Sequence, residues 1–136
     1  MTKPHRKLLI YLPLAALIIA LGLPARLVPN LLPTWYVAYA GDVLWAMLLY
    51  CVCALLLGRS TPQTLCIALL IACFIEASQL FHPPWLEQLR AIRPLAFVLG
   101  FSFLWSDIIA YVLGIVCAAL LDLLLLNATN PTSPHQ

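Results

Sequence analysis

Four long apolar stretches constrain the fold of this chain more than any other feature of its sequence. As helices rising 1.5 Å per residue, they would cover about 24 to 36 Å, which suits a hydrocarbon core of about 30 Å. Helices also satisfy their own backbone polar groups, as lipid requires. We therefore predict an all-α integral membrane four-helix bundle that forms one domain over residues 1–126 and precedes a polar tail, with spans at residues 8–23, 42–57, 64–81 and 104–126.

The composition excludes several classes of protein. Apolar residues make up 64% of the 136 residues and charged residues only 9%, and the mean hydropathy is +1.01. Soluble globular domains lie far from these values. The apolar composition predicts membrane lipids as partners. Because the net charge is only +2, we expect no nucleic acid as a partner. All five cysteines lie within the predicted spans, without the spacing of a metal site, so we expect no metal and no cofactor.

The connection before the last span predicts a short interfacial element. Residues 85–93 (WLEQLRAIR) can form an amphipathic helix in the membrane interface, because Trp85, Leu86, Leu89 and Ile92 share one face. Residues 94–104 are apolar but too short to cross the membrane, so we expect a re-entrant or interface-hugging segment there. A surface loop or an N-terminal extension of the fourth helix is the alternative.

Basic residues predict the orientation. Four of them fall on the side of the termini: Lys3, Arg6, Lys7 and Arg59. Three fall on the other side: Arg26, Arg90 and Arg93. The positive-inside rule then places both termini in the cytoplasm and the two long connections outside. The alternative is that the first stretch is a secretory signal cleaved after the small-x-small triplet of residues 20–22. Pro24 would then be the second mature residue, which argues against cleavage.

One glutamate lies in the middle of the third apolar stretch. A charged acid near mid-bilayer costs about 2.5–3.5 kcal/mol on the mildest scale, so Glu76 is a functional-site candidate by default. Gln79 follows one helical turn later and shares its face. The alternative is a structural salt bridge or hydrogen bond that fixes the pairing of two helices.

Polar residues of separate spans converge on one side of the membrane. On the fourth span, Asp107 and Tyr111 share a stripe with Gly114, whose small size allows a neighbouring helix to come close. We predict an outward-facing polar pocket formed by Glu76, Gln79, Asp107, Tyr111, Asp42, Arg26, Arg90 and Arg93.

The aspartates and arginines of this set have simpler interpretations. Helix capping is the alternative for Asp42 and Asp107. For the three arginines we favour interfacial anchoring over contact with a ligand. Asp122 lies about 22 Å further along the fourth helix than Asp107. We expect it to be solvated near the opposite membrane face, with no part in the pocket.

Several of these segments resemble a known family. GLPAR at residues 22–26, GDVLWA at 41–46, EASQL at 76–80 and DIIAYVLG at 107–114 are similar to small bacterial membrane proteins of the domain-of-unknown-function 2809 family and, more widely, of the VanZ-like superfamily. The resemblance implies a four-helix protein of the bacterial inner membrane, associated with the cell envelope. Its signature residues are Glu76, Gln79 and Asp107. VanZ-like proteins are associated with resistance to a lipoglycopeptide antibiotic. VanZ itself tends to carry asparagine where this chain has Tyr111, so we do not infer that resistance for this chain.

Three classes of function follow. We favour a non-enzymatic protein that binds an envelope lipid, glycolipid or peptide headgroup in the pocket. The second class is an intramembrane enzyme acting on a lipid-linked substrate, with Glu76 and Asp107 as acid and base. The third is a proton-linked carrier, which the apolar composition of the inner half disfavours. The second and fourth spans each have a face with small residues, which permits a homodimer as readily as packing within one chain.

Overall fold

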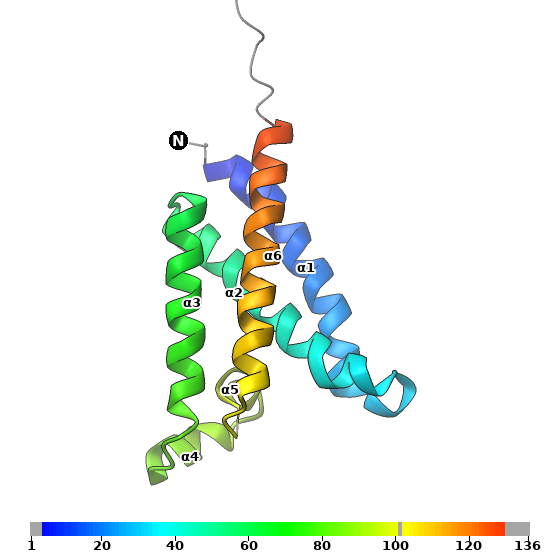
Figure 1. Ribbon diagram of the computed structural model, residues 1–136, viewed down its shortest axis with the longest axis vertical. Coiled ribbons are helices and arrows are strands. Elements are labelled where there is room, and N and C mark those ends of the chain that lie inside the picture. The colour runs from blue at the N-terminus through cyan, green and yellow to red at the C-terminus, as the bar shows by residue number, and fades with distance from the viewer. Residues whose placement is uncertain (1–3, 101, 130–136) are drawn as a thin grey trace, which may run out of the picture.

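The computed structural model describes residues 4–100 and 102–129, and helices connected by short loops make up this part of the chain (Figure 1). Four segments are long and apolar enough to cross a membrane: Leu8–Leu27, Tyr36–Leu57, Thr61–Ser78 and Trp105–Leu125. They belong to α1 (Pro4–Leu27), η2 (Tyr36–Ala40) with α2 (Gly41–Leu57), α3 (Thr61–Ser78) and α6 (Trp105–Thr129). The chain is thus a multi-pass membrane protein, and the predicted all-α bundle is confirmed.

The first two spans are longer than the sequence predicts. α1 continues through Pro24 to Leu27, because helices in membranes tolerate the lost proline hydrogen bond, and the Pro24 carbonyl still accepts the N–H of Val28 at 3.0 Å. The second span begins with η2, a π-helical turn that runs into α2 through a helical Gly41 (φ −58°, ψ −45°). Asp42 therefore lies inside a continuous helix, and the capping alternative for it is wrong, since the N-cap of α2 is Ala40.

The third span is displaced toward the N-terminus relative to the prediction. α3 begins at Thr61, because Ser60 is extended and Pro62 fits the first helical turn. It ends at Ser78, where the next N–H groups form tighter turns such as that from Leu80 to the carbonyl of Ala77 at 3.1 Å. Gln79 is consequently the C-cap residue of α3 rather than an interior residue.

α2 and α6 form the centre of the bundle. They pack against each other, α1 packs on α2, and α3 packs on both. A side chain at Gly114 of α6 would place its Cβ 2.3 Å from the carbonyl oxygen of Val43, so only glycine permits this close approach. The described ends of the chain lie together at the top of Figure 1. We call the other end, where α1 and α3 finish and α2 and α6 begin, the pocket end.

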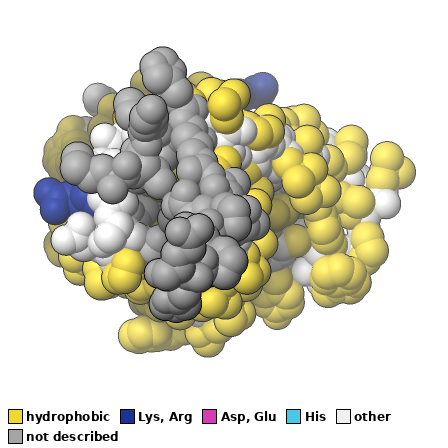
Figure 2. Space-filling view, turned by 90° about the horizontal axis from the view of Figure 1, so that it is seen from above, with side chains coloured by type: hydrophobic (Ala, Val, Ile, Leu, Met, Phe, Trp, Pro, Cys, Tyr) yellow, Lys and Arg dark blue, Asp and Glu magenta, His cyan; other side chains and the backbone are white. Residues whose placement is uncertain are grey.

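The outside of the bundle is apolar. Large hydrophobic side chains are exposed along all four spans, among them Leu9, Leu56, Leu70, Phe74 and Leu124. Figure 2 shows such side chains around the bundle when it is seen from above. The buried core consists mostly of small residues and tyrosines, including Ala46, Tyr50, Ala68, Ala72 and Ala118. This distribution suits a protein with lipid outside and closely packed helices inside.

Two short helices lie at the pocket end between α3 and α6. α4 (Pro84–Arg90) confirms the predicted short helix, although it stops before residue 93. The predicted apolar face is only partly buried: Leu86 is covered, whereas Trp85 and Ile92 are exposed. The following apolar segment forms α5 (Arg93–Leu99), which ends at Gly100 and contacts both α3 and α4. The chain thus folds over this end of the bundle before it enters α6 (Figure 1).

Candidate functional site

Glu76 joins α3 to α6 at the pocket end. Its side chain is fully buried, and its carboxylate accepts three hydrogen bonds. Oε1 accepts the backbone N–H of Leu104 at 3.1 Å, and Oε2 accepts the Tyr111 hydroxyl at 3.1 Å and the Gln79 amide at 2.9 Å. Because Leu104 immediately precedes α6, Glu76 satisfies a backbone donor at the start of that helix. The position of Glu76 therefore supports the structural interpretation of this residue.

A glycine of the connection makes room for the Gln79 side chain. A Cβ atom on Gly100 would lie only 2.6 Å from Nε2 of Gln79, and Gly100 has a positive φ of 63° with an extended ψ of −179°. That backbone conformation is essentially restricted to glycine. Gly100 thus lets the chain pass directly over the Gln79 amide. The amide in turn donates to Glu76 and borders the open space beyond.

Tyr111 connects the same network to α2. Its hydroxyl donates to Glu76, and its ring lies 5.2 Å from the ring of Trp45 at an interplanar angle of 44°. Aromatic pairs at this separation contribute about 0.5–1.5 kcal/mol beyond their buried area. The side chains of Tyr111 and Gln79 are therefore fixed from behind by hydrogen bonds and packing.

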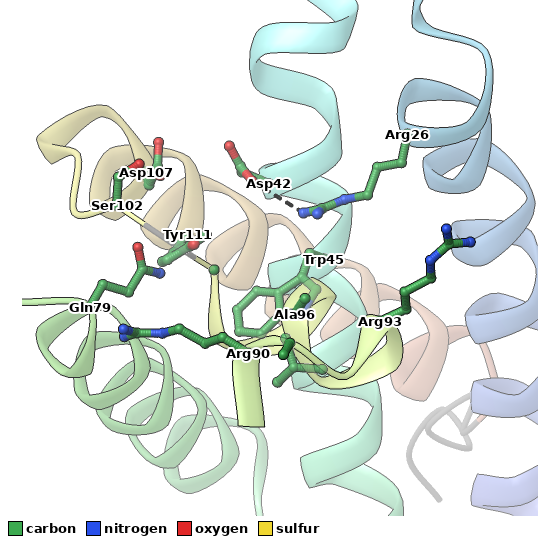
Figure 3. Close-up of a pocket in the computed structure, with 13 residues that line it drawn as sticks. Arg26, Asp42, Trp45, Gln79, Arg90, Arg93, Ala96, Ser102, Asp107 and Tyr111 are labelled. Atoms are coloured by element: carbon green, nitrogen blue, oxygen red, sulfur yellow. Dashed lines mark ion pairs between the residues drawn. The ribbon is translucent and has the colours of Figure 1, made fainter. Parts of the chain in front are cut away.

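A pocket of about 670 Å³ opens in front of these residues. Figure 3 shows side chains from α1, α2, α3, α6 and the α4–α5 connection arranged around it. Seven of the eight residues predicted for the site line it: Arg26, Asp42, Gln79, Arg90, Arg93, Asp107 and Tyr111. The eighth, Glu76, lies buried behind Gln79 and Tyr111. It can position those two side chains but is covered from the pocket itself.

Charged groups of both signs line the pocket. Arg26 and Asp42 form an ion pair with a separation of 3.9 Å (Figure 3). Their side chains are 41% and 25% exposed, so this pair adds little stability. The carboxylate of Asp107 accepts the hydroxyl of Ser106 at 3.1 Å, and Arg93 is exposed at the N-terminus of α5. Asp107 lies within the first turn of α6, where a negative charge also complements the helix dipole.

Arg90 is the most deeply buried cation of the site. Only 1% of it is exposed, and its guanidinium donates to the carbonyls of Ser78 and Phe81 at 3.0 and 3.1 Å. It also pairs with Glu87 at 2.6 Å. These contacts satisfy one carbonyl group at the end of α3 and one in the turn that follows it, as cationic side chains commonly do. The expectation that Arg90 is an interfacial anchor is therefore wrong. Its Nε is buried and has no hydrogen-bond partner among the described residues.

A second polar cluster lies at the opposite end of the bundle. The expectation that Asp122 is solvated is wrong, because only 4% of it is exposed. Its Oδ2 accepts hydroxyl hydrogen bonds from Tyr50 at 2.7 Å and from Thr61 at 2.8 Å, and its Oδ1 accepts one from Tyr11. The four residues come from four different helices. Asp122 therefore joins α1, α2 and α3 to α6.

Sequence reasoning missed several residues of the site. Trp45 lines the pocket and lies three residues after Asp42, on the same helix face, so helical spacing could have identified it. Ser102 and Gly100 also line the pocket, but they come from a loop without periodicity. Their sequence carries no comparable signal.

A family model described as "Protein of unknown function (DUF2809)" matches residues 31–115. The chain belongs to the DUF2809 family. The matched region contains α2 to α5 and the first part of α6, and therefore every pocket residue except Arg26. Tyr11 and Asp122 lie outside it. No solved structure matches the DUF2809 chain. The wider similarity to the VanZ-like superfamily stays a prediction.

Proposed function

We propose that this DUF2809 protein binds the polar headgroup of an envelope lipid, glycolipid or peptide in the pocket between α2, α3, α6 and the α4–α5 connection. One observation carries the proposal: a pocket of about 670 Å³, lined by Arg93, Asp107 and Gln79, is present in a protein whose other surfaces are largely apolar. Ionisable groups within membrane spans are costly, and proteins that keep them commonly use them.

The pocket is preorganised for binding. Glu76 holds Tyr111 and Gln79 through hydrogen bonds of 3.1 and 2.9 Å, and Gly100 leaves room for the Gln79 amide on the other side. Side chains that are already fixed lose little conformational freedom when a ligand binds. Asp107 and Arg93 then offer groups that can form charge-assisted hydrogen bonds.

The alternatives receive less support. An enzyme that used Glu76 and Asp107 as acid and base would need both carboxyl groups to touch its substrate. Glu76 is fully buried and its carboxylate is engaged by three donors, which weighs against that role. A proton-linked carrier would need a polar path between the pocket and Asp122. Ile115 and Ala118 of α6 lie between these ends and are buried and apolar.

The cellular setting is part of the proposal. The count of basic residues supports a pocket that faces outward from a bacterial inner membrane, with both termini in the cytoplasm. The EASQL and DIIAYVLG motifs support a relationship to VanZ-like envelope proteins. An outward-facing pocket would reach headgroups of the outer leaflet.

The test is native mass spectrometry of the protein purified in mild detergent with added envelope lipids. The unmodified protein should retain lipid at one site, and Arg93→Gln with Asp107→Asn should lose most of it. Arg59→Gln, in the loop between α2 and α3 at the opposite end, is the matched control and should retain lipid. Equal retention by all three proteins would exclude the pocket as the binding site.

A further inference from the structure

A second cavity adjoins the polar pocket and is almost entirely apolar. It has a volume of about 280 Å³ and lies between α1 and α2, with walls that include Ile18, Gly22, Leu44 and Leu48. Arg26 and Trp45 line both this groove and the polar pocket. A charged space and an apolar groove therefore meet at two shared side chains, an arrangement that suits a molecule with a polar head and an apolar tail.

Gly22 helps to keep the groove open. A Cβ atom there would lie 3.6 Å from Cβ of Leu44, which is ordinary van der Waals contact. Alanine therefore fits at this position, whereas a larger side chain would extend into the groove. The groove runs along the spans and the pocket lies at their end. A lipid in the membrane has the same arrangement, with its acyl chains beside the spans and its headgroup at their end.

The charges of the pocket indicate the kind of headgroup. Arg26 pairs with Asp42, and Arg90 pairs with Glu87. Arg93 and Asp107 then add one further cation and one further anion to the lining. A pocket with both signs is complementary to a headgroup with both signs. Arg26 lies at the junction with the groove, where the phosphate of a phospholipid follows its acyl chains, and guanidinium groups bind phosphate well.

We infer that the ligand is a phospholipid with an amino headgroup, with its phosphate beside Arg26, its amine beside Asp107 and one acyl chain in the groove between α1 and α2. This inference rests on the proposed function and narrows it to one class of ligand. It also assigns a use to the apolar groove, which headgroup binding alone does not require.

Trp45 allows a direct test, because it lines both cavities. Trp35, Trp85 and Trp105 are exposed and are replaced by phenylalanine, so that fluorescence reports on Trp45. The full chain in detergent is titrated with phosphatidylethanolamine brominated in its acyl chains, and bromine quenches a tryptophan that it contacts. Quenching of Trp45 should saturate at about one lipid per protein and should be reversed by unbrominated phosphatidylethanolamine.

Gly22→Leu should weaken this saturable quenching by about tenfold or more, because forcing extra atoms into an occupied site is costly. Ala16→Leu, exposed on the same helix and outside the groove, is the matched control and should bind normally. Circular dichroism checks that both variants stay helical. Brominated phosphatidylglycerol, which lacks the amine, should bind more weakly than phosphatidylethanolamine, and Asp107→Asn should remove that difference.

The possible results distinguish a failure of the phospholipid inference from a failure of the proposed headgroup binding. One result is that brominated lipid quenches Trp45 equally in Gly22→Leu and Ala16→Leu while Asp107→Asn still alters the headgroup preference. In that case the groove is not the site of the acyl chain, and the proposed pocket stands. If the two lipids bind equally well and Asp107→Asn changes nothing, the amino headgroup is wrong. If, in addition, native mass spectrometry shows no retention of envelope lipids that depends on Arg93 and Asp107, the proposed function fails as well.

Discussion

A 3.1 Å hydrogen bond from the Tyr111 hydroxyl to the carboxylate of Glu76 joins α6 to α3 at the edge of the pocket. The acid that the sequence marks as unusual for a membrane span therefore acts behind the cavity rather than in it. Tyr111 and Gln79 present the surface that a ligand would meet, and Glu76 determines where those two groups lie.

Replacing Glu76 tests this positioning role. Glu76→Gln keeps the size of the side chain but leaves one amide oxygen to accept from Leu104, Tyr111 and Gln79. At least one buried donor then loses its partner, which costs about 1–3 kcal/mol. We expect the free energy of unfolding in detergent to fall by that amount. Ser106→Ala, at an exposed site, should change it little. An unchanged stability for Glu76→Gln would refute the contacts described for this carboxylate.

Gly100 offers a second test close to the pocket. Gly100→Ala would force a side chain into a positive-φ conformation and place its Cβ 2.6 Å from Gln79, so we expect a loss of about 1–3 kcal/mol in unfolding free energy. Lipid retention should fall with it, because Gln79 must move. Gly41→Ala is the matched control: Gly41 is helical, and a Cβ there meets nothing within 4 Å. That variant should be neutral or slightly more stable. Two variants of equal stability would count against the close approach of Gly100 to Gln79.

Asp122 should matter for stability without touching the pocket. Asp122→Asn replaces one acceptor oxygen by a donor that faces the hydroxyl groups of Tyr11, Tyr50 and Thr61. We expect the free energy of unfolding to drop by about 1–3 kcal/mol, while the affinity of the folded protein for lipid stays the same. Thr61→Val, which removes only one donor, should cost less. A normal stability together with weaker lipid binding would show that the two ends of the bundle are coupled.

Replacing Arg90 tests whether it acts through its specific contacts at the end of α3 or only through its positive charge. Arg90→Lys keeps the charge but cannot reproduce the contacts to Ser78, Phe81 and Glu87 at the same time, because the guanidinium fork presents its donors in a fixed plane. We expect faster amide hydrogen exchange at the end of α3 and in α4 than in the unmodified protein. Arg93→Lys, at an exposed position, should leave exchange there unchanged. If both variants exchange alike, Arg90 does not hold α3 and α4 together.

Much of the fold follows from local sequence. Apolar length alone identifies the four spans, since the membrane sets the length of each helix. The spacing of Asp107, Tyr111 and Gly114 correctly indicates the face of α6 that turns inward, where Tyr111 and Gly114 are buried. Alternation of the spans then brings Glu76, Asp42 and Asp107 to one end. These features depend on period and order along the chain, which the sequence displays directly.

The remaining features depend on contacts between elements that are distant in sequence. Asp122 looks like an interfacial acid until Tyr11, Tyr50 and Thr61 from three other helices surround it. Arg90 likewise looks like a surface residue, because only the fold brings it beneath the end of α3. The groove between α1 and α2 arises from the way these two helices pack against each other. Neither the spacing of residues nor the composition predicts contacts of this kind.

Photochemical labelling tests the central claim most directly. Phosphatidylethanolamine carrying a diazirine on its headgroup is irradiated with the purified protein, and mass spectrometry of peptides locates the attached lipid. We expect labelling of the residues that line the pocket, near Gln79 and between Ser102 and Tyr111, with a marked decrease in the combined Arg93→Gln and Asp107→Asn variant. Labelling that is confined to lipid-facing side chains such as Leu9, Leu56 and Phe74, and that is unchanged in this variant, would contradict it.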